Sequence, residues 1–466
     1  MGTQSSARGV SRRAFLGMAA SSIGVVGASS LGLAGATSVL AARPNKNPSR
    51  NPLYVPPTVA PDNLQLIAQG GEVDLGGGRM SSAWVYNGSL PGPTIEARAG
   101  GTASMVLHNQ LSQPTITHWH GMIVDHKNDG HPMQAVGPGG QYAYSFPIRN
   151  RAALNWYHPH PHMLTGEQVA MGLAGGFIIR DAVEDALGLP SGAHEVPLVL
   201  RDTAFDKSGD ITYKPRMGGF EGPTPLVNGT LNPRLDVDTA LYRLRVLGGS
   251  NARIFRLALG NGASFTLIGN DGGLLPSAVS ISQLELSPGE RLDLLVDFRG
   301  ASVGDSVMLR DLRTGWDLLE FKVIRKVTDQ GTIPTALSTI TPLTNPVTTR
   351  EFSFDGMSKI NGRLYDMERV DFYVPFGAVE RWRFTTSGNA PHPVHVHGAS
   401  FQVVSRSRGR NQLYPWEAGW KDTVLLEDQE TVEVMIRFDA YRGMYLMHCH
   451  KLEHEDMGMM SNFVVE

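Results

Sequence analysis

The feature that most constrains the fold is an internal repeat. An Asn-Gly pair followed by a strand-like stretch recurs at Asn87 in VYNGSLPGPTIEARAGG, at Asn228 in LVNGTLNPRLDVD and at Asn361 in KINGRLYDMERVDFYVPFG. Other matches keep the same order: RLRVLGGSNARIFRLALG parallels RWRFTTSGNAPHPVHVHG, and SPGERLDLLVDF parallels EDQETVEVMIRF. Because a fixed repeat indicates copies of one structural unit, the sequence predicts three related units.

Composition and local patterning indicate that each unit is built from strands. The 466 residues include 53 Gly and 29 Pro, and short segments such as TASMVLHNQ and RLDLLVDF alternate apolar and polar residues. Alternation with a period of two is typical of half-buried strands, and Gly and Pro mark the turns between them. The sequence therefore predicts an all-β fold.

Two stretches rich in breakers or polar residues separate the units. DAVEDALGLPSGAHE begins at Asp181, and KVTDQGTIPTALSTITPLTNPVTT begins at Lys326. We therefore expect domains at residues 50–181, 190–326 and 345–466. The formal net charge is -3 and the basic residues are scattered, which argues against a nucleic acid partner.

The N-terminal segment has the pattern of an export signal. In SRRAFLGMAASSIGVVGASSLGLAGATSVLAA, paired Arg12 and Arg13 precede a weakly apolar run that ends in small residues. This pattern predicts a signal at residues 1–42 that is read by the twin-arginine export machinery, with a periplasmic or extracellular mature protein. The alternative is an uncleaved membrane anchor, but the small residues favour cleavage, and thus no stable membrane insertion after processing.

Histidine is distributed unevenly among the units. Most of the 15 histidines fall in four motifs of the first and third units, HWHG, WYHPHPH, HPVHVHG and HCHKLEH. Where the third unit reads APHPVHVHG, the second reads ARIFRLALG, so the second repeats the scaffold without the imidazoles. This distribution predicts a metal site shared between the first and third units.

The His-X-His spacing has a geometric reason. Residues i and i+2 of a strand project from the same face, roughly 6.5 Å apart, so each imidazole can serve a neighbouring metal ion. A single pair is more often structural than metal-binding. Four pairs in two repeated units indicate a cluster of metal ions.

The only cysteine of the chain, Cys449, lies at the centre of the densest histidine motif. In a strand its side chain faces away from the histidine on either side, so it would bind one metal ion while they bind others. With His392, His454 and the thioether of Met459, it makes the donor set of a blue-copper electron-transfer centre. The alternative, a small buried hydrophobic residue, is disfavoured by these neighbours.

The motifs HWHG, WYHPH, HPVHVHG and HCHKLEHEDMGMM, in this order across three repeats, resemble those of the three-domain multicopper oxidases, which include laccases, bilirubin oxidases and bacterial cuprous oxidases. The resemblance covers essentially the whole chain after the signal segment. It implies three cupredoxin-like Greek-key β-sandwich domains and four copper ions. One type 1 ion would lie in the third domain, and one type 2 and two type 3 ions would lie between the first and third domains.

The resemblance also implies which residues bind each ion. The type 1 ion would be bound by His392, Cys449, His454 and axial Met459, the type 2 ion by His118 and His395, and the type 3 pair by His120, His158, His160, His397, His448 and His450. The residues alone also allow His160 and His162 as a pair. The family pattern WYHPH favours His158 and His160, and leaves His162 at the rim.

Two carboxylates beside these motifs match groups that deliver protons in the family. Asp129, in NDGHP, and Glu455, next to His454, would act as general acids through water. The structural alternatives are an Asp-Gly turn residue for Asp129 and an exposed acid for Glu455. Asp422, in GWKDTV, is either a residue that orients a ligand or a satisfied structural carboxylate.

The expected activity follows from electron counting. Dioxygen needs four electrons to become two waters, whereas phenols, aromatic amines and low-valent metal ions release them one at a time. The resemblance implies that electrons enter near the surface through the edge of His454 and pass along Cys449 to His448 and His450. The expected partners are O2 and a small reducing substrate, and the expected state is a monomer.

The substrate class rests on a departure from the family pattern. Bacterial cuprous oxidases of this family carry a methionine- and histidine-rich insert before the core of the third domain. Here FSFDGMSKINGR leads directly into the domain, and Met357 and Met367 are scattered. An uncovered type 1 site favours a laccase-like oxidase, with a cuprous metallo-oxidase as the alternative.

Two further alternatives belong to other classes. A metal-free exported scaffold protein of the same fold should have damaged motifs, and a two-domain-type copper nitrite reductase needs no type 3 pair. Every ligand position is filled here, which disfavours both.

Overall fold

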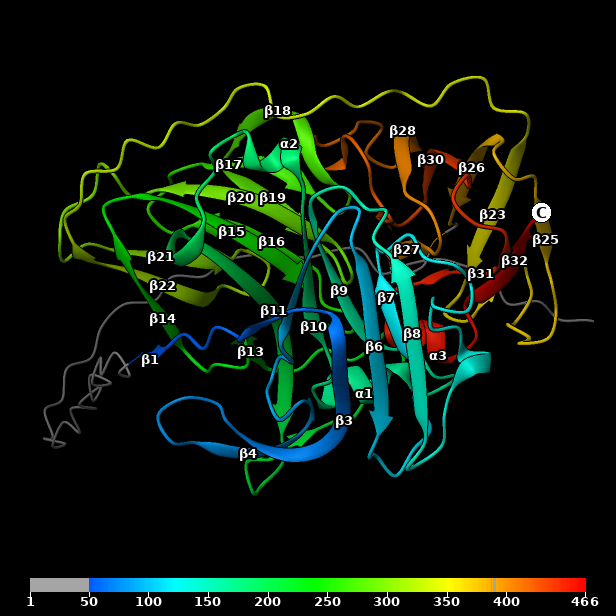
Figure 1. The fold of residues 1–466 in the computed structure, drawn as a ribbon, viewed down its shortest axis with the longest axis horizontal. Helices are drawn as coiled ribbons and strands as arrows, with labels where there is room; N and C mark the ends of the chain where they lie inside the picture. The colour runs from blue at the N-terminus through cyan, green and yellow to red at the C-terminus, as the bar shows by residue number, and fades with distance from the viewer. Residues whose placement is uncertain (1–49, 387, 389–390) are drawn as a thin grey trace, which may run out of the picture. The chain divides into compact units, whose positions relative to one another are not determined.

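Strands form most of the regular structure of the computed structural model, which describes residues 50–386, 388 and 391–466 (Figure 1). The predicted all-β fold is confirmed. The helical segments are short: α1 (Thr165–Met171), α2 (Ala182–Asp185), α3 (Leu452–Asp456), and the 3-10 helices η1 (Pro132–Gln134), η2 (Gly192–His194) and η3 (Pro415–Glu417). No helix in the described part of the chain is long and apolar enough to cross a bilayer. The signal predicted at residues 1–42 lies outside the described residues.

The strands of residues 58–180 form two sheets. One has the order β2 (Thr58–Val59), β5 (Thr94–Arg98), β10 (Gly175–Arg180), β9 (Ala153–Pro159) and β7 (Thr117–His120). The other has the order β4 (Met80–Tyr86), β3 (Asp62–Asp74), β6 (Thr102–Asn109) and β8 (Gln141–Pro147). Leu107 of β6 and Phe177 of β10 belong to one hydrophobic cluster, so the core of this unit lies between the sheets.

A second pair of sheets contains the strands of residues 195–325 and the short β1 (Asn51–Pro52), which pairs with β14. One sheet continues from β1 as β14 (Pro233–Asp238), β22 (Trp316–Arg325), β21 (Ser306–Asp311), β16 (Phe255–Leu259) and β19 (Gln283–Leu286). The other has the order β12 (Ile211–Thr212), β11 (Glu195–Phe205), β15 (Leu241–Gly248), β20 (Arg291–Asp297), β17 (Phe265–Asn270) and β18 (Gly273–Ile281), with β13 (Thr224–Val227) on β11.

The strands of residues 349–465 form the third pair. One sheet has the order β24 (Lys359–Ile360), β23 (Thr349–Asp355), β26 (Val379–Thr385), β30 (Glu430–Arg437) and β28 (Phe401–Arg408). The other has the order β25 (Phe372–Val374), β32 (Met460–Val465), β31 (Gly443–Cys449), β27 (His392–Val396) and β29 (Thr423–Leu426). The exact domain boundaries stay a prediction.

The repeated Asn-Gly pairs adopt one local structure in all three units. Asn87, Asn228 and Asn361 have φ of 50°, 49° and 52°, and the glycine after each also has a positive φ, as Asn-Gly hairpin turns require. Each asparagine Oδ1 accepts a hydrogen bond from a main-chain N–H of another strand: Ile67 at 2.6 Å, Val199 at 2.7 Å and Ser353 at 2.7 Å. The repeat in the sequence is therefore a repeated clamp between the turn and a neighbouring strand.

The strands that carry the histidine motifs meet between the first and third units. β7 pairs with β9 in the register His118 to His158, and β27 pairs with β31 in the register His395 to His448. In Figure 1 the cyan strand β7 lies beside the orange β27, and the Nε2 atoms of His118 and His395 are 3.3 Å apart. Two pairs of strands thus bring their histidines to one place.

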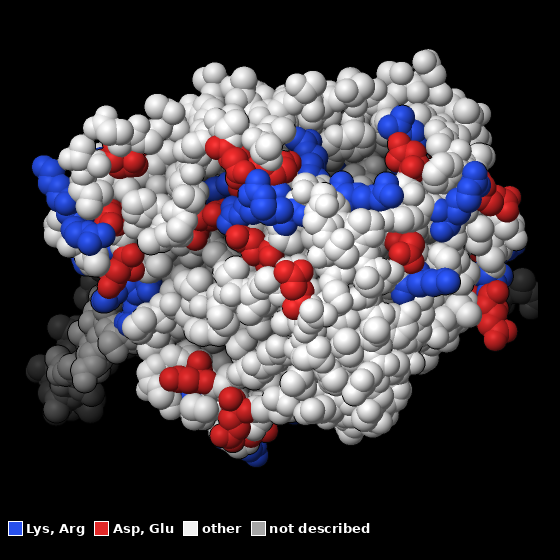
Figure 2. Space-filling view, in the orientation of Figure 1, with Lys and Arg blue, Asp and Glu red and all other residues white. Residues whose placement is uncertain are grey.

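The surface shown in Figure 2 has no concentrated basic patch. Lys and Arg side chains are interspersed with Asp and Glu over this face. A nucleic-acid-binding face would instead gather its basic side chains.

Candidate metal centres

Strand alternation divides the donors of the third unit between two faces of one sheet. On β27, His392 shares a face with Val394, which belongs to the hydrophobic core, whereas His395 lies on the other face. On β31, Cys449 is paired with Val394 and belongs to the same core cluster, while His448 is paired with His395. One group of donors therefore forms on the core side of the sheet and a second on its outer side.

The core-side group consists of His392, Cys449 and His454. Cys449 Sγ lies 3.5 Å from His392 Nδ1 and 3.7 Å from His454 Nδ1, and the two Nδ1 atoms are 3.2 Å apart. Met459 is buried in the same core cluster as Cys449, and its main-chain carbonyl accepts a hydrogen bond from the Cys449 N–H at 3.1 Å. Two imidazoles and a thiol this close are the donors of a blue-copper centre.

Burial sets the ionisation of this group. It raises the pKa of the Cys449 thiol to about 12 and lowers the pKa of His392 to about 3 and of His454 to about 2. Both imidazoles are therefore neutral near pH 7 and keep a lone pair for a ligand bond. A thiol buried this deeply loses its proton only beside a cation, so the donor set fits a soft metal ion.

The expected accessibility of His454 is wrong. Its side chain has an exposed fraction of 0%, whereas we expected its edge near the surface. His454 lies on α3, which packs against α1 of the first unit, and its ring faces Cys449 and His392. Asp456 of α3 accepts hydrogen bonds from the N–H groups of Thr165 and Gly166 at 3.0 and 2.8 Å, which fixes the two helices together.

Histidines from the first and third units form the outer group. The members are His118, His120, His158, His160, His395, His397, His448 and His450, all buried. Several Nε2 atoms converge: His118 and His395 at 3.3 Å, His397 and His448 at 3.0 Å, and His160 and His448 at 3.3 Å. The structure thus brings together every histidine that the family resemblance assigns to the trinuclear cluster.

Four members of the outer group have ring nitrogens without a partner. His120 Nδ1, His158 Nε2, His160 Nδ1 and both ring nitrogens of His450 are buried and have no hydrogen-bond partner among the described residues. The His450 ring centroid lies 4.8 Å from that of His120 and 5.3 Å from that of His158. Leaving buried polar atoms unsatisfied costs free energy, and metal ions at these lone pairs would remove that cost.

The outward nitrogens of other members are held by hydrogen bonds. His118 Nδ1 donates to the main-chain carbonyl of Asp129 at 2.6 Å, and His397 Nδ1 donates to Asp129 Oδ2 at 2.8 Å. His395 Nδ1 donates to the main-chain carbonyl of Asp422 at 2.8 Å. These bonds place the proton on the outward nitrogen, so Nε2 offers its lone pair inward.

Asp129 and Glu455 both lie directly behind the histidines. Both side chains are buried, so the alternative of an exposed acid for Glu455 is wrong. Glu455 Oε2 lies 3.2 Å from His448 Nδ1, and its Oε1 lies 3.7 Å from His160 Nδ1. Burial raises the pKa of Asp129 well above its usual value, whereas the imidazoles outweigh burial at Glu455 and hold its pKa below its usual value.

His162 lies outside both groups. It is half-buried, its ring centroid is 5.4 Å from that of Tyr365, and it belongs to no cluster of metal donors within the described residues. The geometry therefore favours His158 and His160 as the pair from this motif.

Sequence reasoning missed two residues of the second unit that contact this region. Arg291 forms a buried ion pair with Asp422, and Gly289 approaches the rings of His120 and His450 so closely that an added Cβ would lie 3.1 Å from each. One signal was available for Arg291: it begins a strand, RLDLLVD, that is otherwise mostly apolar, and a charge in such a strand needs a buried partner.

Comparisons with known proteins agree with this geometry. Two family models, both described as multicopper oxidase, match residues 68–184 and 332–466. A multicopper oxidase of Staphylococcus haemolyticus is 33% identical over 412 residues, covering 86% of this chain and 88% of the relative. A cell division protein, FtsP, of Dickeya dadantii is 31% identical over 444 residues, covering 90% of this chain and 93% of the relative.

A solved structure is similar over almost the same length. The crystal structure of a laccase from Pediococcus acidilactici matches with a TM-score of 0.85 and 35% identity, covering 90% of this chain and 94% of that one. This likeness confirms the predicted fold class of three cupredoxin-like Greek-key β-sandwich domains.

Proposed function

The chain belongs to the multicopper oxidase family, and on this premise we propose that it is a laccase-like enzyme that couples one-electron oxidation of phenols or aromatic amines to four-electron reduction of O2 to water. Family membership makes it a copper-binding oxidoreductase. The observation that carries the finer proposal is the complete donor set. Every imidazole expected at the two centres, together with the only cysteine, is buried, and all of these donors except His450 fall in clusters that could hold a metal ion.

We assign four copper ions to these donors. The type 1 ion would be held by His392, Cys449, His454 and Met459, the type 2 ion by His118 and His395, and the type 3 pair by His120, His158, His160, His397, His448 and His450, all of them buried. Copper at these sites would supply reversible one-electron transfer at the first centre and multi-electron reduction of O2 at the second.

The chain itself supplies the connection between the centres. Cys449 and His448 are neighbours on β31 with side chains on opposite faces of the sheet, so a single peptide links the two groups of donors. This covalent route favours electron transfer from the thiolate side to the imidazole side.

Protons for water formation come in this proposal from Asp129 and Glu455. Both carboxyl groups are within hydrogen-bond or ion-pair distance of histidines of the outer group, and each would pass protons through water to the reacting oxygen.

The reducing substrate binds, in this proposal, at a surface hollow of about 620 Å³ whose walls include Leu364, Tyr365 and Met367. The hollow adjoins the turn that precedes Met459, because a Cβ built at Gly458 would lie 3.4 Å from Leu364 Cδ2. Since His454 is buried, an electron would cross the packed residues between the hollow and its ring, without direct contact between substrate and His454. Leu364 and Tyr365 would offer apolar and aromatic contacts to a phenol ring, beside the charged side chains of Lys359, Arg363, Asp366 and Arg369.

Absorption, copper content and oxygen uptake of the purified mature protein test the proposal. We expect an intense blue thiolate band, four copper ions per chain and O2 uptake that depends on a phenol. Cys449→Ser should remove the band and the uptake. Retention of colour and oxygen consumption in that variant would refute the proposed electron route.

The substrate class is tested by comparing turnover of 2,6-dimethoxyphenol with turnover of cuprous ion on the same copper-loaded preparation. We expect faster oxidation of the phenol, because the sequence carries no methionine- and histidine-rich insert before the core of the third unit. A large excess of the cuprous rate would instead identify a metallo-oxidase.

A metal-free scaffold role is the second candidate, because several relatives are named cell division protein FtsP. A preparation that binds no copper and takes up no O2 under copper loading would favour it.

Location and assembly complete the proposal. We expect export by the twin-arginine machinery, directed by Arg12 and Arg13, to the periplasm or the medium, and a monomer in solution. Replacing both arginines with lysine should leave the protein inside the cell.

A further inference from the structure

Arg291 lies where the three units meet, and its side chain is fully buried. From the start of β20 in the second unit, its Nε donates to the carbonyl of Leu154 on β9 of the first unit at 3.0 Å. Its Nη1 donates to the carbonyl of Gly289 at 2.8 Å, and its Nη2 to the carbonyl of Asp271 at 3.2 Å. The guanidinium is therefore held rigidly in place by main-chain carbonyls of two units.

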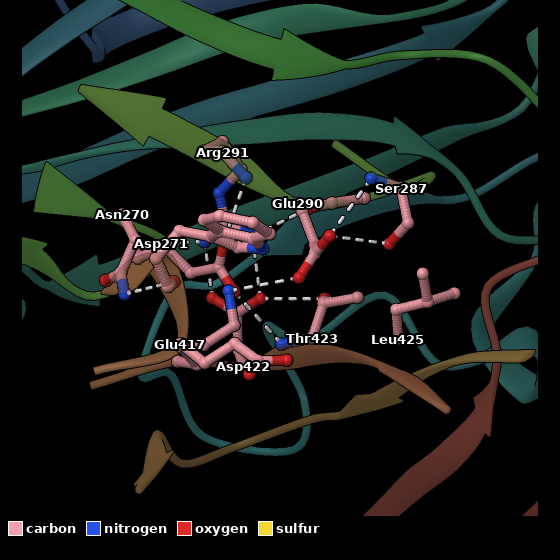
Figure 3. A network of polar contacts seen from close by, with 12 residues as sticks. Asn270, Asp271, Ser287, Glu290, Arg291, Glu417, Asp422, Thr423 and Leu425 are labelled. Carbon is pink, nitrogen blue, oxygen red and sulfur yellow. Dashed lines mark hydrogen bonds and ion pairs between the residues drawn. The ribbon is translucent and has the colours of Figure 1, made fainter. Parts of the chain in front are cut away.

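The same guanidinium forms an ion pair with the carboxylate of Asp422 in the third unit. Arg291 Nη1 donates to Asp422 Oδ1 at 2.6 Å, and Nη2 donates to Asp422 Oδ2, so the pair is bidentate (Figure 3). A second buried pair lies alongside, in which Lys421 Nζ is 2.9 Å from Asp271 Oδ2 and 3.2 Å from Glu290 Oε1. Two cations thus face three carboxyl groups, and Arg291 is the cation in hydrogen-bond contact with Asp422.

Asp422 in turn contacts two histidines of the outer group. Its Oδ1 lies 3.0 Å from His120 Nε2, and its main-chain carbonyl accepts from His395 Nδ1 at 2.8 Å. Thr423 Oγ1, also 3.0 Å from His120 Nε2, donates to Asp422 Oδ1 at 2.9 Å. With its own proton given to Asp422, Thr423 cannot also donate to the ring, so His120 Nε2 carries a proton and Nδ1 keeps the inward lone pair.

This arrangement differs from that of His118, His395 and His397, whose Nδ1 atoms carry the outward hydrogen bond. His120 is turned the other way, with Nε2 outward and the unpartnered Nδ1 inward. Its ring also stacks on that of His395, with centroids 3.7 Å apart. The orientation of two imidazoles therefore depends on where the Asp422 carboxylate is held.

We propose that Arg291, supplied by the unit that lacks histidine motifs, is a positioning residue of the trinuclear centre: it fixes Asp422, which fixes the tautomer and angle of His120 and the position of His395. Gly289 adds to this from the same loop, because it leaves room for the rings of His120 and His450. The second unit thus takes part in oxygen chemistry without donating a ligand.

A purely structural ion pair between units would make a different prediction. It would change only the free energy of unfolding, whereas a positioning residue also changes metal affinity at one centre and not at the other. Loss of a residue that orients a ligand typically weakens metal binding by about 10- to 100-fold. The thiolate centre, on the core side of the third unit, provides an internal reference within the same molecule.

The test compares Arg291→Gln with Arg243→Gln in the full chain. Arg243 is a matched control: it is buried, lies on the adjacent strand β15, and pairs with Asp293 at 2.9 Å and Glu184 at 2.6 Å. Both variants should melt at lower temperature than the wild type. Titration with a copper chelator should strip three of four ions from Arg291→Gln at about 10- to 100-fold lower chelator concentration, with the blue band retained, and should leave Arg243→Gln like the wild type.

A second variant keeps the test decisive if Arg291→Gln does not fold. Asp422→Asn is isosteric and still offers Oδ1 to His120, but it sets an amide N–H against the guanidinium, so we expect partial loss of the same three ions. Wild-type resistance to the chelator in every folded variant of this pair would overturn the inference. So would equal loss in Arg243→Gln.

The inference rests on the proposed copper cluster, but different results would refute the proposed function and the positioning role of Arg291. A wild-type protein that binds no copper defeats the proposed function. A wild type with four ions, alongside Arg291 and Asp422 variants that keep all four, defeats only the positioning role.

Discussion

At the scale of the residue, the burial of Glu455 and its contacts with His448 and His160 indicate what its carboxylate can do. Its carboxylate is enclosed with the outward nitrogens of His448 and His160 and reaches no other donor among the described residues. A carboxylate in that position can orient the rings and can also pass on a proton.

We predict that Glu455→Gln slows O2 reduction on the order of 100-fold, because the amide cannot donate and regain a proton as a general acid does. Steady-state oxygen uptake with excess phenol measures this step. Anaerobic bleaching of the blue band by the same phenol is the control and should keep its wild-type rate. Equal slowing of both would place the residue on the electron route and contradict the proton role.

The residue scale also marks what the sequence could reveal. The spacing of HWHG and HPVHVHG, and the isolation of Cys449, point to metal donors because a strand places i and i+2 on one face. Arg291 carries no such pattern, since its partners Asp422 and Leu154 come from other units. Likewise, the packing of α3, which carries His454, against α1 depends on contacts between units that no local pattern encodes.

At the scale of the element, the Asn-Gly clamp recurs with different burial. Asn228 is buried, with Oδ1 accepting from the Val199 N–H at 2.7 Å and Nδ2 donating to the Pro197 carbonyl at 2.9 Å. Asn361 makes the equivalent bonds at the surface, to Ser353 and Glu351.

We therefore predict that Asn228→Ala lowers the free energy of unfolding by about 2 to 3 kcal/mol and Asn361→Ala by about 1 kcal/mol. Both alanines meet the same positive φ, so backbone strain cancels and burial of the lost hydrogen bonds makes the difference. Thermal unfolding of the two copper-loaded variants, side by side, measures it. A larger loss for Asn361→Ala would show that the turn, and not burial, controls the cost.

The elements themselves were largely predictable. Period-two alternation and the repeated turn gave the all-β class and the threefold organisation, because both are local properties of strands and hairpins. Pairing of β1 with β14 was not predictable from residues 50–181, since only two residues make that contact and their partner lies far along the chain.

At the scale of the whole molecule, the buried histidines make the copper-free protein sensitive to acid. Burial lowers the pKa of His158 to about 4 and that of His160 to about 3, from the ordinary 6.5, with the nearby Glu455 opposing only in part. Below pH 6.5 the unfolded chain therefore binds protons that the folded chain refuses. This difference in proton binding costs no stability above pH 6.5 and lowers the free energy of unfolding progressively as the pH falls toward 4.

We predict that the melting temperature of copper-free protein falls steeply between pH 6.5 and 4. The free energy of unfolding should fall by several kcal/mol, at about 1.4 kcal/mol for each pKa unit. Copper-loaded protein should hold its melting temperature over most of this range, because bound metal competes with protons for the same lone pairs. Scanning calorimetry of both forms at matched pH provides the comparison. Parallel curves would mean that the imidazoles are not neutral in the folded state.

The single peptide between Cys449 and His448 has a consequence for how the enzyme can fail. In the proposed electron route, the connection from Cys449 to His448 lies within one sheet, so relative motion of the first and third units would leave its length unchanged. The same motion would separate the histidines of the outer group, because they come from the first and third units. Heat or mild denaturant should therefore produce, before global unfolding, a form of the protein that still accepts electrons at the Cys449 centre but no longer reduces O2.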